Sequence, residues 1–399
     1  MKTLRSLFKI GNGPSSSHTM GPRQAAIRFT ENLPSETERF EVTLYGSLAA
    51  TGKGHMTDVA IIDVLQPIAP VEVLWEPDTI MSFHTNALRI KAYNKHNEMV
   101  KEDVYYSIGG GDIVRDGDTV KELPDIYDMT TISDILDWCK RTGRSFWEYV
   151  EMCEGPEIWD FLKEVWTAMK ASVERGLENE GVLPGPLGVA RKAVSYFVRA
   201  AGHNSSLKSR GLVYAYALAV SEENAAGNVI VTAPTCGSSG VLPAVMYHLY
   251  TSKGFSETRI LRALATAGLF GNIVKENASV SGAEVGCQGE VGVACAMAAA
   301  AASQLFGGTP QQIEYSAEMG LEHHLGMTCD PVCGLVQIPC IERNAYAAAR
   351  ALDSNLYASF SDGTHSVSFD RIVKVMKQTG HDLPSLYKET ARGGLAVID

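Results

Sequence analysis

Leu-Arg-Ile-Lys-Ala-Tyr, residues 88–93, alternates apolar and polar side chains, which is typical of a β-strand with one buried face. Comparable β-rich runs occupy residues 40–45, 71–75 and 103–108. Short helical patterns accompany them at residues 22–29 and 58–65. These patterns predict an N-terminal α/β domain with an antiparallel or mixed sheet.

Residues from about 130 onward carry helical patterns instead of strand patterns. A long amphipathic pattern covers 158–178, and others cover 207–220, 256–270 and 289–305. Ser133 and Ser256 are candidate N-caps, and Gly271 is expected to end the helix that follows Ser256. The alanine-rich run 291–303 predicts a central helix, because its small side chains let neighbouring backbones approach closely.

The chain has 399 residues, which is enough for two domains. The patterns predict an α+β protein with an N-terminal domain at 1–125 and a mainly helical domain at 126–399. The linker is expected at 117–128, where charged residues and a proline interrupt the pattern. A second weak point is the stretch 181–188, which is rich in glycine and proline.

Composition excludes several classes of protein. The hydrophobic fraction of 45% is typical of a globular chain, and the net charge of −11 argues against a nucleic-acid partner or an anionic membrane surface. The most apolar run, 291–303, is too short for a membrane span. Since residues 1–10 lack the apolar core of a secretory signal, we expect a cytoplasmic protein whose 8 cysteines are reduced.

Two glycine-rich loops in the first domain carry histidines. The loop 11–22 reads Gly-Asn-Gly-Pro-Ser-Ser-Ser-His-Thr-Met-Gly-Pro, whose hydroxyls and free N–H groups suit a carboxylate or a phosphate. The loop 51–58 places His55 just after two glycines, where it would be exposed and oriented by Thr57 or Asp58 as a general base. The alternatives are a helix-capping loop and a solvated turn. The loop 234–240 in the second domain is a further candidate for anion binding.

The cysteines are the sharpest feature of the second domain. Cys287, Cys329 and Cys340 lie among glycines and prolines, and no Cys-x-x-Cys motif occurs. Three thiolates with a vacant fourth position would suit an iron–sulfur cluster with a Lewis-acid iron. Two alternatives stay open: zinc bound with His323 or His324, and buried cysteines with a purely structural role.

Several long motifs together resemble the iron–sulfur-dependent bacterial L-serine dehydratases over nearly the whole chain. In the first domain they are Pro-Ser-Ser-Ser-His-Thr at 14–19, Thr-Gly-Lys-Gly-His at 51–55 and Tyr-Tyr-Ser-Ile-Gly-Gly-Gly at 105–111. In the second they lie at 184–188, 233–235, 283–288, 328–331, 340–344 and 389–396.

This resemblance implies an oxygen-sensitive [4Fe–4S] cluster held by Cys287, Cys329 and Cys340. It implies deamination of L-serine to pyruvate and ammonia in a homodimer, at a site between the two domains. The open iron would bind the hydroxyl and carboxylate of serine, and His55, or else His18, would remove the Cα proton. The groups expected to hold the substrate are Ser15, Ser16, Ser17 and Thr19, assisted by Thr235, Ser238 and Ser239.

The chain departs from the family pattern in three places. It ends without the cysteine that reaches the fourth iron in many members, so we do not expect the tail to ligate the cluster, although Asp399 or its α-carboxylate could substitute. Cys333 stands where a small residue is usual; the alternatives are a fourth ligand that would close the open iron and a spectator, and we favour the spectator. Cys236 replaces a common asparagine, which brings L-threonine and L-cysteine into consideration as substrates.

The sequence also leaves alternatives to an L-serine dehydratase. One is a related lyase acting on cysteine or threonine. Another is an iron–sulfur redox or electron-transfer protein, although electron transfer normally uses four protein ligands and needs no histidine–serine site. A third is an N-terminal domain that senses amino acids. A pyridoxal-phosphate enzyme would also deaminate serine, but no sequence environment picks out a Schiff-base lysine.

Overall fold

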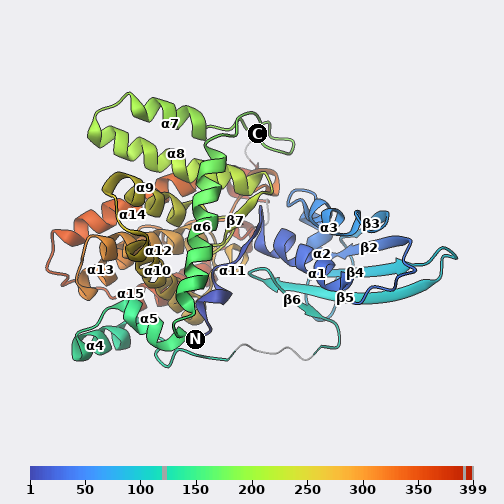
Figure 1. The fold of residues 1–399 in the computed structure, drawn as a ribbon, viewed down its shortest axis with the longest axis horizontal. Coiled ribbons are helices and arrows are strands. Elements are labelled where there is room, and N and C mark those ends of the chain that lie inside the picture. Colours follow the sequence, from blue (N-terminus) through green and yellow to red (C-terminus); the bar gives the residue numbers. More distant parts are fainter. Residues whose placement is uncertain (119–123, 390–391, 398–399) are drawn as a thin grey trace. The chain divides into compact units, whose positions relative to one another are not determined.

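The computed structural model describes residues 1–118, 124–389 and 392–397. The chain forms two compact units (Figure 1). One is the sheet unit, Gly11–Glu122, and the other is the helical unit, which combines Met1–Ile10 with Leu123–Asp399. The predicted α+β class is therefore confirmed. The predicted linker 117–128 falls partly outside the described residues.

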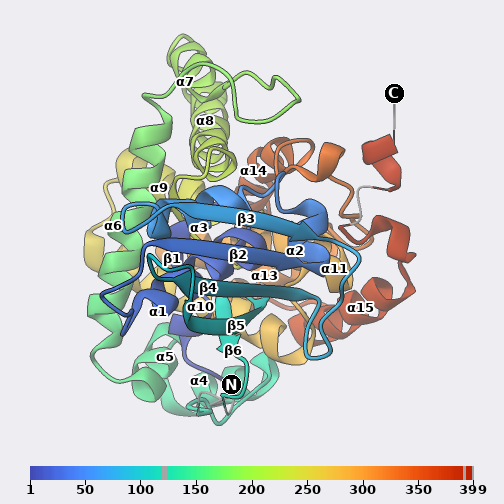
Figure 2. The same ribbon diagram turned by 90° about the vertical axis from the view of Figure 1, so that its right-hand side faces the viewer.

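The sheet unit contains a five-stranded mixed sheet with the order β3-β2-β4-β5-β6 (Figure 2). Its strands are β2 (Arg39–Tyr45), β3 (Val71–Glu76), β4 (Asn86–Tyr93), β5 (Met99–Gly109) and β6 (Asp112–Arg115). β2 pairs with β3 in parallel, and the other neighbours are antiparallel. The alternating run 88–93 lies in β4, where Leu88, Ile90 and Ala92 are buried.

Three helices pack on one face of this sheet: α1 (Gly21–Thr30), α2 (Gly46–Thr51) and α3 (Thr57–Leu65). Phe29 from α1 packs edge-on against Phe40 of β2, with ring centroids 6.2 Å apart. On the other face polar side chains pair across strands, as Lys91 and Glu41 do at 2.9 Å. This face of the sheet is thus buried under α1 and α3, which follow the two glycine-rich loops, and under α2, which precedes the second loop.

The helical unit is built around α12 (Val293–Leu305), the alanine-rich helix (Figure 1). The other elements are α4 (Ile132–Thr142), α5 (Phe146–Glu154), α6 (Ile158–Gly176), α7 (Ala193–Ala201), α8 (Ser205–Ala225), β7 (Val229–Val231), α9 (Val241–Lys253), α10 (Glu257–Asn277), α11 (Gly282–Val285), α13 (Pro310–Glu322), α14 (Cys340–Ser359) and α15 (Phe369–Asp382). The short strand β1 (Ile10–Asn12) spans the sequence boundary between the two units. A Cβ on Gly320 of α13 would lie 3.0 Å from the Ala296 backbone, so the two helices approach closely. The predicted central helix is confirmed. Among the described helices, none combines the length and apolarity needed to cross a bilayer.

Two predicted helix boundaries are wrong. Gly271 does not end α10, which continues to Asn277. A Cβ at Gly271 would lie 2.7 Å from Met297 Sδ and 2.8 Å from Leu7 Cδ2, so this glycine serves close packing. The N-cap of α4 is Thr131, whose hydroxyl accepts from the Asp134 N–H, whereas Ser133 donates its hydroxyl to Asp370.

The first ten residues pack in the helical unit, against residues that are distant from them in the sequence. Leu4 and Phe8 are fully buried, and both touch the position of Gly268 in α10, where a Cβ would lie 2.8 Å from each side chain. Lys9 N–H donates to Thr232 Oγ1, and Thr232 N–H donates back to the Lys9 carbonyl, each at 2.9 Å. The N-terminal segment therefore completes the core of the helical unit.

Replacing Phe8 with alanine is expected to lower the free energy of unfolding of the helical unit by about 3–5 kcal/mol, the usual range for a buried phenylalanine. Urea unfolding followed by tryptophan fluorescence measures this, because Trp138, Trp147, Trp159 and Trp166 all lie in that unit. Val198→Ala, at an exposed position of α7, is the control and should change little. A loss below about 1 kcal/mol for Phe8→Ala would contradict the packing described.

Candidate active site

The serine-rich loop of the sheet unit holds His18 in a fixed orientation. Ser15 is the N-cap of a π-helical turn, Ser16–Met20, and its hydroxyl accepts from the His18 N–H at 3.1 Å. α1 follows directly, with Pro22 in its first turn. The two ring nitrogens of His18 contact the hydroxyls of Ser17 and Ser47, each at 2.9 Å. Both ring nitrogens of His18 thus have hydroxyl partners.

His55 lies beside His18, with ring centroids 4.7 Å apart. Its Nδ1 is 3.1 Å from the Thr51 carbonyl oxygen. A carbonyl only accepts, so Nδ1 carries the proton and Nε2 keeps a lone pair. Thr19 ties the two loops together by donating its hydroxyl to the His55 carbonyl at 2.7 Å. The structure therefore brings together two histidines that are 37 positions apart in the sequence.

The predicted surroundings of His55 were wrong in two respects. The imidazole is buried, with 3% of its residue surface exposed, because the turn folds back against the serine-rich loop. Thr51, not Thr57 or Asp58, orients its ring. The Thr57 hydroxyl instead donates to the His18 carbonyl at 2.6 Å, which fixes the other histidine.

Burial controls the charge of both imidazoles. It lowers the pKa of His55 to about 4. Burial together with the neighbouring His55 lowers the pKa of His18 to about 3. Both rings are therefore neutral at pH 7, and the Nε2 lone pair of His55 is available as a base.

The sheet unit is expected to lose stability as the pH falls from about 6.5 toward 4. In this window the unfolded histidines bind protons while His55 and His18 stay neutral, and each contributes about 1.4 kcal/mol per pH unit. Above pH 6.5 their contribution is constant. Urea unfolding at pH 7.5 and 4.5, followed by pulsed hydrogen exchange of the sheet unit, measures the loss. His55→Gln should reduce that loss by about 2–3 kcal/mol, and an equal loss in both proteins would contradict the assignment.

A second group of side chains lies in the helical unit, where three cysteines from distant parts of the sequence come together. Cys287 precedes α12, Cys340 begins α14, and Cys329 lies in the loop between α13 and α14. All three are buried. A hydrogen bond with Cys287, together with burial, raises the pKa of the Cys329 thiol well above its usual value. Burial and the proximity of Cys287 do the same for the pKa of Cys340.

Glu290 lies against two of these thiols, with Oε2 3.9 Å from the Sγ of Cys287 and 3.9 Å from that of Cys329. Its other oxygen, Oε1, accepts from the Thr235 hydroxyl at 2.7 Å. Burial raises the pKa of Glu290 despite these hydrogen bonds. Two thiols and a carboxylate thus form a compact donor group.

The loop 234–240 lies beside this group and supports Glu290. Thr235 Oγ1 is 3.1 Å from Ser238 Oγ, so the Thr235 hydroxyl lies between Ser238 and the carboxylate. Ser239 is buried, and its hydroxyl has no hydrogen-bond partner among the described residues. Cys236 is buried too, and burial with the nearby Glu290 carboxylate raises the pKa of its thiol.

Arg343 supplies positive charge beside the thiols. It lies one helical turn after Cys340 on α14 and donates to the Thr328 carbonyl at 2.6 Å and to Asp330 at 3.1 Å. Burial alone would lower the pKa of this guanidinium, but the neighbouring Cys287 and Asp330 raise it. The burial of Glu389, with Glu290 nearby, raises the pKa of the Glu389 carboxyl to about 8.

Sequence reasoning missed Glu290, Arg343 and Glu389. A signal existed for the first two, since Glu290 follows Cys287 by three residues and Arg343 follows Cys340 by three, the spacing of one helical turn. Glu389 begins the motif 389–396, but nothing in the sequence relates it to Cys329, which is 60 positions away. The link between them is a backbone bridge in which Glu389 N–H donates to the Cys329 carbonyl at 2.8 Å.

The other predicted ligands lie apart from the thiols. Cys333 is exposed in a short turn at φ +55°, which agrees with its interpretation as a spectator. Among the residues that the structure describes, the one group of donor atoms suited to a metal ion is Cys287, Glu290 and Cys329, without His323 or His324. His324 is buried with Nδ1 2.7 Å from the Gly320 carbonyl. Asp399 lies outside the described residues.

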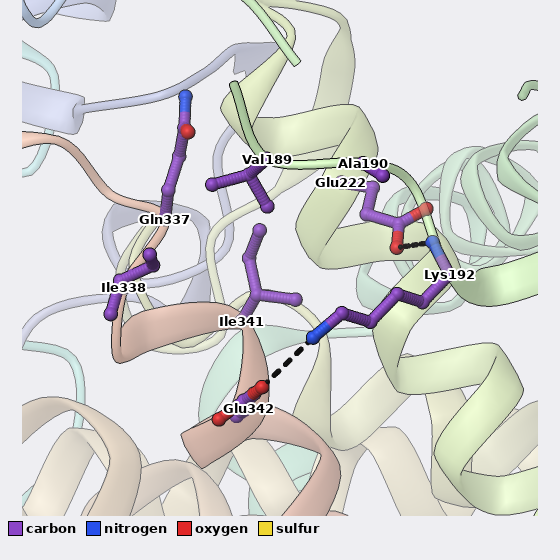
Figure 3. Close-up of a pocket in the computed structure, with 8 residues that line it drawn as sticks. All are labelled: Val189, Ala190, Lys192, Glu222, Gln337, Ile338, Ile341 and Glu342. Carbon is purple, nitrogen blue, oxygen red and sulfur yellow. Dashed lines mark hydrogen bonds and ion pairs between the residues drawn. The ribbon is translucent and has the colours of Figure 1, made fainter. Parts of the chain in front are cut away.

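A separate cavity of about 110 Å³ borders the first turn of α14 (Figure 3). Aliphatic side chains dominate its lining, and the ammonium of Lys192 pairs with Glu342 at 3.0 Å beside it. The residues that line it are Val189, Ala190, Lys192, Glu222, Gln337, Ile338, Ile341 and Glu342. The lining includes neither a thiol nor an imidazole, and its two carboxylates already have protein partners: Glu222 accepts from the N–H groups of Lys192 and Ala193, and Glu342 pairs with the Lys192 ammonium.

Comparisons with known proteins account for almost the whole chain. Residues 3–76 match the serine dehydratase beta chain family, and residues 84–396 match the serine dehydratase alpha chain family. The L-serine dehydratase of Streptomyces coelicolor is 42% identical, over 98% of this chain and 97% of that protein. L-serine dehydratase 1 of Escherichia coli is 40% identical, over 100% and 99%. The L-serine dehydratase of Helicobacter pylori is 38% identical, over 99% and 98%.

Proposed function

The chain belongs to the bacterial serine dehydratase family, and on that basis we propose that it converts L-serine into pyruvate and ammonia. The observation that carries the proposal is the match to L-serine dehydratases along their full length. In this reaction serine loses its Cα proton and its β-hydroxyl as water. The resulting 2-aminoacrylate tautomerises and is hydrolysed to pyruvate and ammonia.

We propose that Cys287, Cys329 and Cys340 hold a [4Fe–4S] cluster. The donor set fits this group, because the thiols are buried, Cys287 raises the pKa of both Cys329 and Cys340, and the Arg343 guanidinium offsets part of their negative charge. When bound, such a cluster supplies a Lewis acid that makes hydroxide a better leaving group. Soft thiolate donors select iron or zinc over magnesium or calcium, which agrees with this assignment.

The proposed base is His55, with His18 as its partner. Removal of the weakly acidic Cα proton needs a neutral, fixed acceptor, and His55 Nε2 meets both requirements. His18 is the second choice because both its ring nitrogens already contact hydroxyls. In this proposal His18 supports the base through the 4.7 Å ring contact.

The serine hydroxyls of the sheet unit are proposed to bind the substrate carboxylate. Ser15, Ser16 and Ser17 belong to a helix-start loop whose donors suit an anion. Thr19 would act by holding this loop to the base, since its hydroxyl donates to the His55 carbonyl. Thr235, Ser238 and Ser239 were expected to assist from the helical unit, and the first two would do so through Glu290.

We also propose that the protein is a cytoplasmic homodimer. A reducing compartment suits a protein whose function requires three free thiols. A second copy would cover the apolar side chains that α14 leaves exposed, Tyr346, Leu356 and Tyr357, and Phe360 just beyond its end, which is 84% exposed. Sedimentation analysis tests the dimer, and a monomer at micromolar concentration would contradict it.

The test of the function is pyruvate formation after anaerobic reconstitution with iron and sulfide. L-Serine, L-threonine and L-cysteine are compared, and an aliquot exposed to air runs in parallel. Pyruvate from serine that disappears in air supports both the reaction and the cluster. Turnover that survives air and a chelator would contradict the cluster. A loaded protein that acts faster on cysteine or threonine would reassign the substrate, with Cys236 as the first residue to revert to asparagine.

A further inference from the structure

We propose that the cluster-free chain binds a single divalent metal ion through Cys287, Glu290 and Cys329, a site distinct from the three-cysteine set. The three donor atoms all lie within 4.8 Å of one another, and the oxygen is 3.9 Å from each sulfur. A tetrahedral ion with bonds of about 2.3 Å to sulfur and about 2.1 Å to oxygen separates these donors by about 3.6 Å. The two oxygen–sulfur distances therefore need to shorten by a few tenths of an ångström, and the sulfur–sulfur distance, which is at most 4.8 Å, by up to about 1 Å.

The carboxylate that completes this site is held in place. Thr235 donates to Oε1 at 2.7 Å and leaves Oε2 turned toward the two sulfurs. Gly282 keeps the space open, because a Cβ there would lie 2.5 Å from Oε2 and 3.1 Å from Cys329 Sγ. The Glu290 carboxylate is therefore oriented by a hydrogen bond and has room beside Gly282, so it is already placed to bind a metal ion.

The local charge also suits a divalent ion. Binding displaces the protons of the two thiols and of Glu290 into solvent, which leaves two thiolates and a carboxylate around the ion. Their net charge with a 2+ ion is −1, and the adjacent Arg343 guanidinium, which also pairs with Asp330, offsets part of it. Zinc and ferrous iron are the ions that accept sulfur and oxygen donors in a tetrahedral arrangement, with water as the fourth ligand.

The site is tested on the reduced chain after chelator treatment under anaerobic conditions. Zn²⁺ affinity is measured by competition with a chromophoric chelator, and Co²⁺ is added separately to record sulfur-to-metal charge-transfer absorption. We expect one ion per chain with a tetrahedral cobalt spectrum. Glu290→Gln keeps the shape and the Thr235 contact but removes the anionic donor, so it should weaken Zn²⁺ binding at least about 10–100-fold. Glu284→Gln, at an exposed position of α11, is the matched control and should bind as the wild type does.

Cys340→Ser separates the two possible donor sets. It should change Zn²⁺ affinity by less than about threefold, whereas Cys329→Ser should abolish tight binding. The proposal is overturned if Cys340→Ser weakens binding as strongly as Cys329→Ser, because the ion would then be held by three thiols. It is also overturned if Glu290→Gln binds as the wild type does, or if no variant changes the affinity.

A consequence for enzyme assembly rests on the proposed function. An ion in this site occupies two of the three thiols assigned to the cluster, so one equivalent of Zn²⁺ added before iron and sulfide should block loading. Glu290→Gln should be less sensitive to this block. Because Zn²⁺ binding is measured without a cluster, a protein that binds zinc yet never deaminates serine would contradict the proposed function and leave the metal site standing.

Discussion

Replacement of Cys287, Cys329 or Cys340 by serine is expected to remove both iron loading and serine turnover. Each thiol is buried and comes from a different part of the chain, so neither of the other two thiols can take its place. Loss of a metal ligand in a closed site typically removes tight binding altogether. Loss of Lewis-acid assistance to a poor leaving group costs several kcal/mol in the transition state, which is about 10³-fold or more in rate.

Iron per chain and visible absorbance after reconstitution are measured together with pyruvate formation. Cys333→Ser is the matched control, since Cys333 lies between two of the three positions in the sequence but is exposed. It should load and react as the wild type does. Loss of iron in Cys333→Ser, or full iron content in Cys340→Ser, would show that the ligand assignment is wrong.

Replacement of His55 by alanine is expected to lower kcat by about 10²–10⁴-fold, the usual contribution of a general base. Iron content should stay normal, because His55 belongs to the sheet unit and the thiols to the helical unit. His96→Ala, at an exposed position of the same unit, is the control and should leave the rate unchanged. Near-normal turnover in His55→Ala would transfer the role to His18 or another group.

The pH dependence gives a second test of the same base. Because burial lowers the pKa of His55 to about 4, the acid limb of kcat/KM should fall near pH 4 and not near 6.5. The base is active above its pKa, so the rate should be flat from about pH 5.5 to neutrality. An acid limb near pH 6.5 that persists in His55→Gln would contradict the assignment.

The sheet was predictable because one face of each strand is buried, which imposes a period of two, as in 88–93. The ends of the helices were harder to predict from the sequence. Gly271 has the composition of a helix end, yet what determines its role is the packing of Leu7 and Met297, two residues far away in the sequence. Local sequence carries no information about such contacts.

In the candidate site, too, some features could be predicted from the local sequence, and others depend on long-range packing. Cys287, Cys329 and Cys340 were identified through motifs, but only the fold reveals that Glu290 lies between two of them with Thr235 behind it. The glycines around His55 suggested exposure, whereas the contact with Thr19 buries it. Residue type indicated the chemistry, and long-range packing set protonation and orientation.

The packing of the first ten residues into the core of the helical unit has a consequence for synthesis on the ribosome. Phe8 leaves the exit tunnel early, while Gly268, against which it packs, is translated 260 residues later. At about 5–20 residues per second this delay is roughly 13–50 s. The sheet unit, Gly11–Glu122, is complete within that interval and can fold first. The apolar N-terminal segment, with Leu4 and Phe8, meanwhile waits without its partners and is the part of the nascent chain for which chaperone protection matters most.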